Sequence, residues 1–224
     1  VVDKPVIQYV VEEAVASGIS DVIIITGEQK RAIEDHFDRS VELEDYLIEK
    51  GKFKEAEEIK KIGELANFIY IRQKGNAYGN AIPVLAAEPV IGNEPFAVMW
   101  GDEFIHADPP RLAQMIEAYN KYPGIIISGV RIETEDQLSR YGIADLEPVE
   151  GNIFKIKKIV EKPLPKEAPS NLATHGAYIL PPEIFNVIRN LKPGKGGEVW
   201  LVDAIKELMA RGVPVYACEI KNSK

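Results

Sequence analysis

The feature that most constrains this chain is its alternation of short β-branched runs with longer amphipathic segments. Residues 21–26 read DVIIIT, a run typical of a strand buried on both faces of a parallel sheet. Before it, residues 5–17 carry apolar side chains at helical spacing, and Gly18 follows as a stop signal. Because helices between strands form crossovers to parallel neighbours, this succession predicts an α/β fold with a mostly parallel sheet.

The alternation continues through the chain, although several extended segments follow one another after Tyr141. In the first half we expect strands at residues 67–72, 95–99 and 124–130, helices at residues 30–37, 80–87 and 110–121, and a helical hairpin at residues 41–64 broken at Gly51. In the second half we expect extended segments at residues 142–146, 153–160, 172–180 and 213–219, and helices at residues 182–190 and 199–211. The sequence therefore predicts a single domain over residues 1–224, with two halves that meet near residue 130.

Charge and composition exclude several classes of protein. The 224 residues carry a net charge of −8 without a block of Lys or Arg, which argues against a nucleic-acid-binding surface. No run of about 18 apolar residues is present, and the first residues include acidic ones where a signal peptide needs basic ones. We therefore expect a cytoplasmic protein without a membrane span. The single Cys218 excludes an internal disulfide, and its apolar neighbours indicate a structural role.

Ligands bind open α/β sheets beyond the carboxyl ends of the strands, where three groups of residues are candidates. The first is the loop at residues 73–79. Its Gly75 and Gly79 permit close approach of the backbone to a flat ligand, and Gln73 offers both a donor and an acceptor to a nucleobase. The same glycines also suit a plain turn between strand and helix, so the loop alone leaves both interpretations open.

The second candidate is Asp102, which follows the apolar run PFAVMWG. A carboxylate at the end of a buried strand is well placed to hold Mg²⁺ against phosphate oxygens, and Glu103 offers a second oxygen ligand nearby. A role of Asp102 as a turn or cap residue is the alternative. His106 is a poor ligand for Mg²⁺, and we interpret it as structural.

The third candidate is the pair Glu161 and Lys162, which closes an expected strand just before Pro163. A carboxylate accepts hydrogen bonds from sugar hydroxyls, and Lys supplies a point charge for a phosphate. Neighbouring residues of a strand point to opposite faces, so Pro163 must bend the strand end if both side chains are to contact one ligand. A solvent-exposed Glu–Lys pair is the alternative.

In this order, the candidate residues and their surroundings resemble the bacterial-type UTP:glucose-1-phosphate uridylyltransferases (UDP-glucose pyrophosphorylases) of the nucleotide-diphospho-sugar transferase superfamily. The matching segments cover nearly the whole chain: VVDKPVIQYVVEEAVASGISDVIIITG, RQKGNAYGNAIPVL, WGDEF, YGIADL, VEKPLPKEAPSNLATHGAYIL and GEVWLVDAI. The most specific part runs from Val160 to Asn171 and on to Gly176, because this pattern separates the group from thymidylyltransferases. The resemblance implies a Rossmann-like, mostly parallel mixed sheet flanked by helices, with a nucleotide-binding half followed by a sugar-binding half.

The resemblance also implies a role for each matching position. Uracil would contact Gln73 and the backbone around Ala77 and Gly79. Asp102 would bind Mg²⁺ and Lys162 the phosphate, and these two residues would carry the catalysis. The sugar pocket would comprise Tyr141, Gly142, Glu161, Asn171, Gly176 and Glu198.

The implied reaction is attack of the glucose-1-phosphate oxygen on the α-phosphorus of UTP, giving UDP-glucose and pyrophosphate. A phosphate monoester is already nucleophilic near neutral pH, so catalysis rests on alignment and charge neutralisation rather than on a general base. Homo-oligomers, as dimers or tetramers, are also implied. Two alternatives remain: a related nucleotidyltransferase with another base or sugar, and a catalytically inactive regulatory homologue. An oxidoreductase that binds a dinucleotide is disfavoured because no G-x-G-x-x-G occurs.

The sequence departs from the family pattern in three places. The opening family signature, a strand leading into a Gly-rich loop, does not occur, and Val1 falls where that signature ends. The chain stops at Lys224 just before an Asp-Gly segment of the family, and Ala77 replaces a family glycine. We therefore expect a gap in the sheet with two exposed strand edges and an apolar groove. We also expect the 224-residue polypeptide alone to have negligible transferase activity.

Overall fold

The computed structural model describes residues 4–75 and 77–223, so Lys224 lies outside the described residues. Its helices are α1 (Val6–Ala16), α2 (Arg31–Phe37), α3 (Val41–Glu49), α4 (Phe53–Gly63), α5 (Ala81–Ala86), α6 (Glu88–Ile91), α7 (Arg111–Lys121), α8 (Glu135–Leu138), α9 (Glu183–Asn190) and α10 (Leu201–Ala210), with 3-10 turns η1 (Pro165–Glu167) and η2 (Lys195–Gly197). None of these helices is long and apolar enough to cross a membrane.

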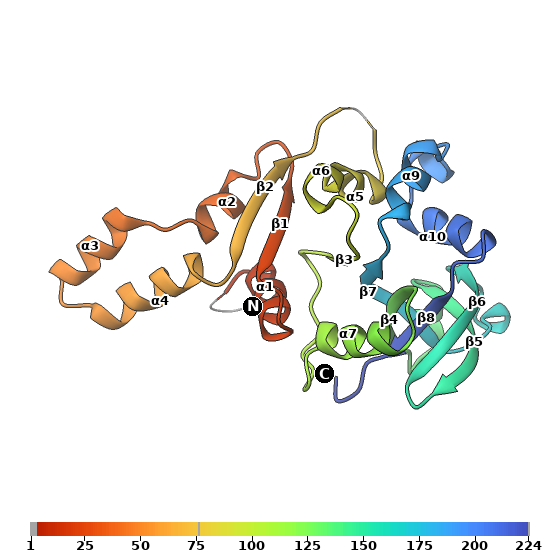
Figure 1. Ribbon diagram of the computed structural model, residues 1–224. Helices are drawn as coiled ribbons and strands as arrows, with labels where there is room; N and C mark the ends of the chain where they lie inside the picture. The colour runs from red at the N-terminus through yellow and green to blue at the C-terminus, as the bar shows by residue number, and fades with distance from the viewer. Residues whose placement is uncertain (1–3, 76, 224) are drawn as a thin grey trace.

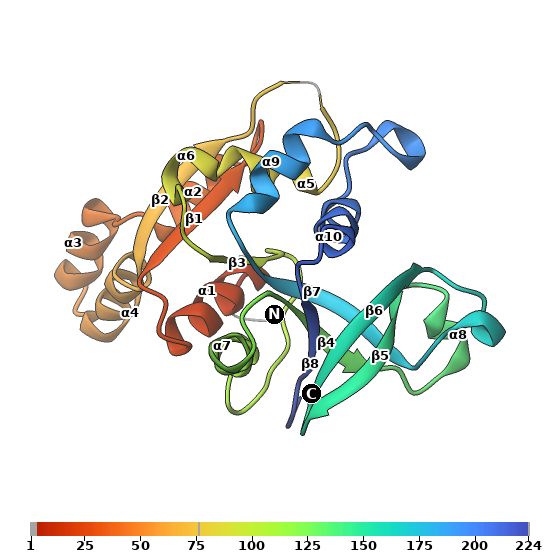
Figure 2. The same ribbon diagram turned by 45° about the vertical axis from the view of Figure 1, so that its right-hand side comes forward.

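The strands form two sheets. They are β1 (Asp21–Thr26), β2 (Asn67–Arg72), β3 (Phe96–Met99), β4 (Ile125–Arg131), β5 (Gly142–Glu150), β6 (Ile153–Glu161), β7 (Leu172–Leu180) and β8 (Val215–Glu219). β1 and β2 pair in parallel, and the other six strands follow the order β3-β7-β4-β8-β6-β5. The predicted strand at residues 142–146 extends to Glu150, and its hairpin with β6 projects from the body (Figure 2).

The predicted mixed α/β fold is confirmed, but the expectation of a mostly parallel sheet is wrong for the larger sheet. There only β4 and β8 pair in parallel among the described strands, whereas β7 runs antiparallel to β3, β4 and β5. β6 is also antiparallel to both β5 and β8. The physical reason lies in the connections, since Gly151 and Asn152 join β5 to β6 by a tight turn rather than by a crossover helix.

The expected pair of unpaired strand edges is confirmed within the described residues. β1 pairs on one side with β2, and β3 pairs on one side with β7. Figure 1 shows β1 and β2 standing apart from the larger sheet, and the helical hairpin of α3 and α4 projecting beyond them. Gly51, at φ +73°, makes the turn of this hairpin, as the sequence predicts.

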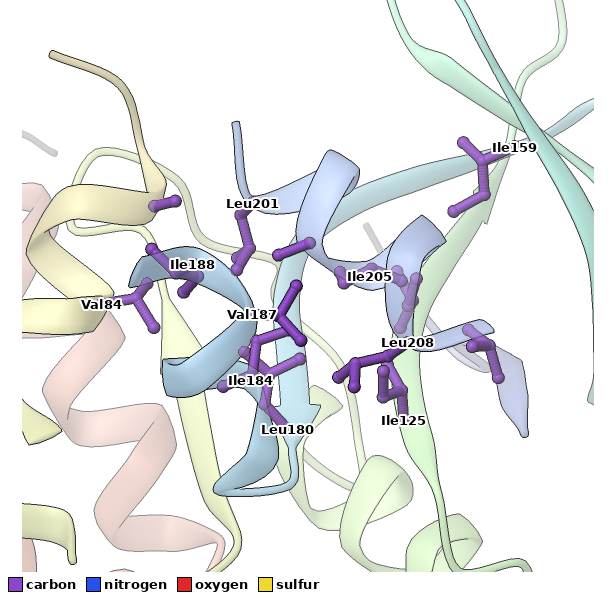
Figure 3. Packing of buried hydrophobic residues seen from close by; sticks show 14 of the residues in the cluster. Val84, Ile125, Ile159, Leu180, Ile184, Val187, Ile188, Leu201, Ile205 and Leu208 are labelled. Carbon is purple, nitrogen blue, oxygen red and sulfur yellow. The ribbon is translucent and has the colours of Figure 1, made fainter. Parts of the chain in front are cut away.

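Helices cover both faces of the larger sheet and bury the core. Because side chains alternate along a strand, Ile125 and Ile127 of β4 face α9 and α10, while Ile126 faces α7. Figure 3 shows the first cluster, in which the apolar side of α9 meets α10 and the sheet. Phe185 of α9 is 2% exposed and stacks on Phe96 of β3, with ring centroids 4.9 Å apart. The core therefore fixes β3, whose carboxyl end leads to Asp102.

Cys218 lies on β8 inside the second cluster and is fully buried. Burial disfavours the charged thiolate and raises the pKa of the Cys218 thiol to about 12. The thiol is therefore protonated and inaccessible in the folded protein, which confirms the structural role predicted from its apolar neighbours.

We predict that Phe185→Ala destabilises the protein by about 3–5 kcal/mol, because it leaves a cavity against Phe96. Leu164→Ala is the matched control, since Leu164 is 64% exposed in the segment between β6 and η1, and it should change the stability by roughly 0.5 kcal/mol or less. Urea unfolding followed by circular dichroism measures both. Equal losses in the two variants would contradict the proposed packing of α9.

Candidate functional site

Asp102 lies on a tight turn that follows β3. The backbone N–H of Glu103 donates to the carbonyl of Trp100 at 3.4 Å and closes the turn. On the strand side, the Trp100 N–H donates to the Gly176 carbonyl of β7 at 3.2 Å. Asp102 itself is exposed and forms no hydrogen bond or ion pair with any residue that the structure describes. The carboxylate is therefore available to an external ligand at the strand end, where the sequence predicts it.

Glu103, expected as a second oxygen ligand, instead turns towards the protein interior. Its Oε1 lies 3.5 Å from Nη1 of Arg111, which is completely buried. The two neighbouring carboxylates therefore differ in their surroundings, since Asp102 is exposed whereas Glu103 lies beside a buried guanidinium. Glu103 thus contacts Arg111 behind the turn, whereas Asp102 faces solvent. A role of Glu103 as a metal ligand stays a prediction.

Gly176 brings the second half of the chain to the Asp102 turn. Its φ of +55° is in the left-handed region, which favours glycine. A Cβ at this position would also overlap the carboxylate of Glu103. The structure therefore places Gly176 beside the metal candidate Asp102, although 74 residues of sequence separate them.

The loop at residues 73–79, of which Asn76 lies outside the described residues, contacts the predicted sugar residue Glu198. Its start is fixed to β1 because the Gln73 N–H donates to the Thr26 carbonyl at 2.8 Å. At its end, Tyr78 and Glu198 form a parallel bridge, in which the Val199 N–H donates to the Tyr78 carbonyl at 2.8 Å. The predicted base residues Ala77 and Gly79 therefore lie next to a predicted sugar residue.

Gly79 makes this contact sterically possible. Its φ is +120°, and a Cβ there would collide with the backbone of Val199. Next to it, the Asn80 side chain accepts a hydrogen bond from the Leu201 N–H at 2.8 Å, in the first turn of α10. Two backbones in direct contact thus join the 73–79 loop to the segment that carries Glu198, and no side chain other than hydrogen fits between them.

The structure brings Tyr141, Gly142, Glu161 and Lys162 together at one end of the β5–β6 pair. Gly142 is the strand partner of Glu161, and the Lys162 N–H donates to the Tyr141 carbonyl at 3.0 Å. Lys162 adopts φ +45°, so the chain bends directly after Glu161, at Lys162 itself rather than at Pro163. The side chain of Glu161 lies outside what the structure describes. The backbone nevertheless has the bend that convergence of the two residues requires.

Thr174 connects these residues to Gly176, and sequence reasoning missed it. Its hydroxyl donates to the Gly142 carbonyl at 3.1 Å, and Gly142 is also its strand partner across β5 and β7. Only the antiparallel β5–β7 pairing reveals this link, because Thr174 has no distinguishing local motif. Thr174, which contacts Gly142, and Gly176, which contacts the Asp102 turn, therefore lie close together on β7.

Asn171 is held differently from the other predicted sugar residues. Its side-chain oxygen accepts a hydrogen bond from Nη1 of Arg131 at 2.7 Å, and its carbonyl accepts one from the Ile132 N–H at 2.8 Å. Arg131 also pairs with Glu219 at 2.8 Å, which holds the pKa of Arg131 above its usual value. Asn171 thus fastens the start of β7 to the end of β4.

The donor set at Asp102 fits Mg²⁺ rather than a metal that needs a full protein cage. Among the described residues, no group of three or more His, Cys, Asp or Glu side chains could hold an ion. Mg²⁺ is commonly bound through one or two carboxylates, with substrate phosphates and water as the remaining ligands. A single exposed carboxylate at a strand end has the chemistry of such a partial site.

A family model and several known proteins match this chain over most of its length. A family model described as nucleotidyl transferase matches residues 1–223. The UTP--glucose-1-phosphate uridylyltransferase YngB of Bacillus subtilis (strain 168) is 46% identical over 217 residues, covering 97% of this chain and 72% of the relative. A second UTP--glucose-1-phosphate uridylyltransferase of that strain is 49% identical over 208 residues, covering 93% and 70%. A solved UDP-glucose pyrophosphorylase complexed with UDP-glucose matches with a TM-score of 0.86 and 39% identity, covering 100% and 81%.

We predict that Gly79→Ala destabilises the protein more than Gly75→Ala, although both glycines have positive φ. Gly75, at φ +87°, has open space at the Cβ position, so its substitution should cost about 1 kcal/mol of backbone strain. Gly79→Ala adds a collision with Val199, for which about 1–3 kcal/mol more is expected. Chemical unfolding gives both values, and limited proteolysis should cut the 73–79 loop faster in Gly79→Ala. Indistinguishable variants would exclude the close contact with Val199.

Proposed function

Because the chain belongs to the nucleotidyl transferase family and is 46% and 49% identical to two UTP--glucose-1-phosphate uridylyltransferases, we propose that it transfers a uridylyl group from UTP to glucose-1-phosphate. The products are UDP-glucose and pyrophosphate. The observation that carries the proposal is the exposed carboxylate of Asp102, on a turn fastened to Gly176 in the other half of the chain. In a nucleotide sugar, phosphates join the nucleoside to the sugar. A carboxylate that holds a metal ion against those phosphates must therefore lie between the nucleotide-binding and the sugar-binding half of the chain.

In this proposal the protein acts by holding the two substrates in line. Asp102 holds Mg²⁺, which when bound neutralises charge on the phosphates. Lys162 contributes a further positive charge at the bend after β6. Since the sugar phosphate is itself the nucleophile, no residue needs to remove a proton from it, and alignment supplies most of the rate enhancement.

The base and sugar contacts divide between the two halves of the chain. Residues before about 130 bind the nucleotide through Gln73, Ala77 and Gly79, and the later residues bind the sugar. Support comes from the backbone contact between Gly79 and Val199, which brings the base loop to Glu198. The sugar residues are Tyr141, Gly142, Glu161, Asn171, Gly176 and Glu198. Among them, Asn171 contributes mainly by fixing β7, because Arg131 occupies its side-chain oxygen.

Two properties of the protein in the cell complete the proposal. It acts in the cytoplasm, where UTP and sugar phosphates are made and consumed. It forms a homo-oligomer, a dimer or tetramer, for which the exposed apolar side chains Leu43, Tyr46 and Phe53 of the α3–α4 hairpin offer a contact surface. Sedimentation velocity of the purified protein distinguishes these assemblies from a monomer.

The function is tested with a panel of nucleotides and sugar phosphates, using the gene product that carries this chain. UTP with glucose-1-phosphate should give a kcat/KM at least roughly tenfold above dTTP or above galactose-1-phosphate, because the site selects by contacts to base and sugar edges. Faster reaction with dTTP would identify a thymidylyltransferase instead. Failure to turn over any pair, together with no UDP-glucose binding by calorimetry, would identify an inactive homologue.

We predict that Asp102→Asn lowers kcat/KM by roughly 100-fold or more, because it removes the charged carboxylate that is proposed to bind the metal directly. Asp35→Asn is the matched control, since Asp35 is exposed on α2 and pairs with Arg31 at 3.7 Å, and its activity should stay within about twofold of wild type. Pyrophosphate release measures both. An Asp102→Asn variant of normal activity would refute the assignment.

A further inference from the structure

A set of buried charges lies directly behind the Asp102 turn. Arg111, at the start of α7, is completely buried and donates to Glu13 of α1 through Nε at 3.0 Å and Nη2 at 3.1 Å. Glu13 also accepts a hydrogen bond from the Leu112 N–H at 3.1 Å, in the first turn of α7. Glu103 completes the set, with its Oε1 3.5 Å from Nη1 of Arg111.

The charges in this set do not balance. The bidentate contact with Glu13 already compensates the guanidinium, and burying a charge is costly unless it is paired in this way. Glu103 is therefore an additional negative charge, and Asp102 beside it is another. The three carboxylates of Glu13, Asp102 and Glu103 and the guanidinium of Arg111 leave an excess of two negative charges, on the turn and directly behind it. This excess attracts a cation to the exposed side of the turn.

The contacts also fix the turn on both sides of Asp102. On one side, Trp100 is hydrogen-bonded to Gly176 of β7. On the other side, the carboxylate of Glu103 fills the space beside Gly176, and Phe104 stacks on Tyr9 of α1 with ring centroids 4.9 Å apart. Glu103 consequently cannot move towards solvent without leaving both Arg111 and Gly176.

From this arrangement we propose that Glu103 is a positioning residue for the divalent cation, held by Arg111 behind the Asp102 turn. It touches neither substrate nor metal. Its negative charge adds to that of Asp102, and its contacts keep the turn in the orientation that presents Asp102. This inference rests on the proposed function, since it assumes that Asp102 receives the cation.

The test measures cation binding directly, by electron paramagnetic resonance of Mn²⁺ titrated into the protein with UDP-glucose present. Glu103→Gln keeps the shape of the side chain but removes its charge, and it should bind Mn²⁺ roughly tenfold more weakly, the size expected for an outer partner of a metal ligand. Glu117→Gln is the control, since Glu117 is exposed on α7, the helix that carries Arg111, and pairs with Lys121 at 3.3 Å. It should bind Mn²⁺ as wild type does.

Glu103→Asp keeps the charge and should stay within about threefold of wild-type Mn²⁺ affinity. If thermal unfolding shows that Glu103→Gln does not fold, the Mn²⁺ affinity of Glu103→Asp is the test, and a loss of more than about threefold would contradict the proposal. Unchanged Mn²⁺ affinity in Glu103→Gln, or equal losses in the Gln and Asp variants, would overturn the role of the charge. Wild-type protein that binds UDP-glucose but no Mn²⁺ would instead overturn the metal assignment of Asp102, and this inference with it.

Discussion

The site depends above all on the position of β7, which is hydrogen-bonded to strands from different parts of the chain. It pairs with β3, β4 and β5, in each case antiparallel. The pairing with β3 places Gly176 at the Asp102 turn, and the pairing with β5 places Thr174 at Gly142. The Asp102 turn and Gly142, which are far apart in sequence, therefore both lie beside one short stretch of β7. A shift of β7 by one residue would turn each of its side chains to the opposite face and separate these contacts.

Two glycines allow backbones to meet where side chains would otherwise keep the segments apart. Gly79 lies against the backbone of Val199, and Gly176 lies against the carboxylate of Glu103. Both also have positive φ, so an L-side chain at either position would be strained as well as obstructed. At these two contacts, the halves of the chain can meet because the side chain is a hydrogen atom.

Buried charge has a complementary role behind the site. A buried ion pair is weak evidence for stability, since desolvation offsets most of its attraction, but it defines which groups must face each other. Arg111 pairs with Glu13 of α1 and with Glu103 of the turn. These two pairs fix the orientation of α1, α7 and the Asp102 turn relative to one another. The apolar contacts around Phe185 stabilise the fold, whereas the pairing of these charges makes its arrangement near the site specific.

The sequence by itself determined the local elements and predicted an exposed carboxylate, Asp102, directly after β3. β1, β2 and β7 have the bounds that their β-branched and apolar runs predict, because such runs express a local preference for extended backbone. Tertiary structure alone decided the antiparallel partners of β7, the inward turn of Glu103 and its pairing with Arg111, and the link from Thr174 to Gly142. Each of these depends on contacts between distant segments, and the pattern of neighbouring residues carries no information about which distant backbone or charge will lie beside them.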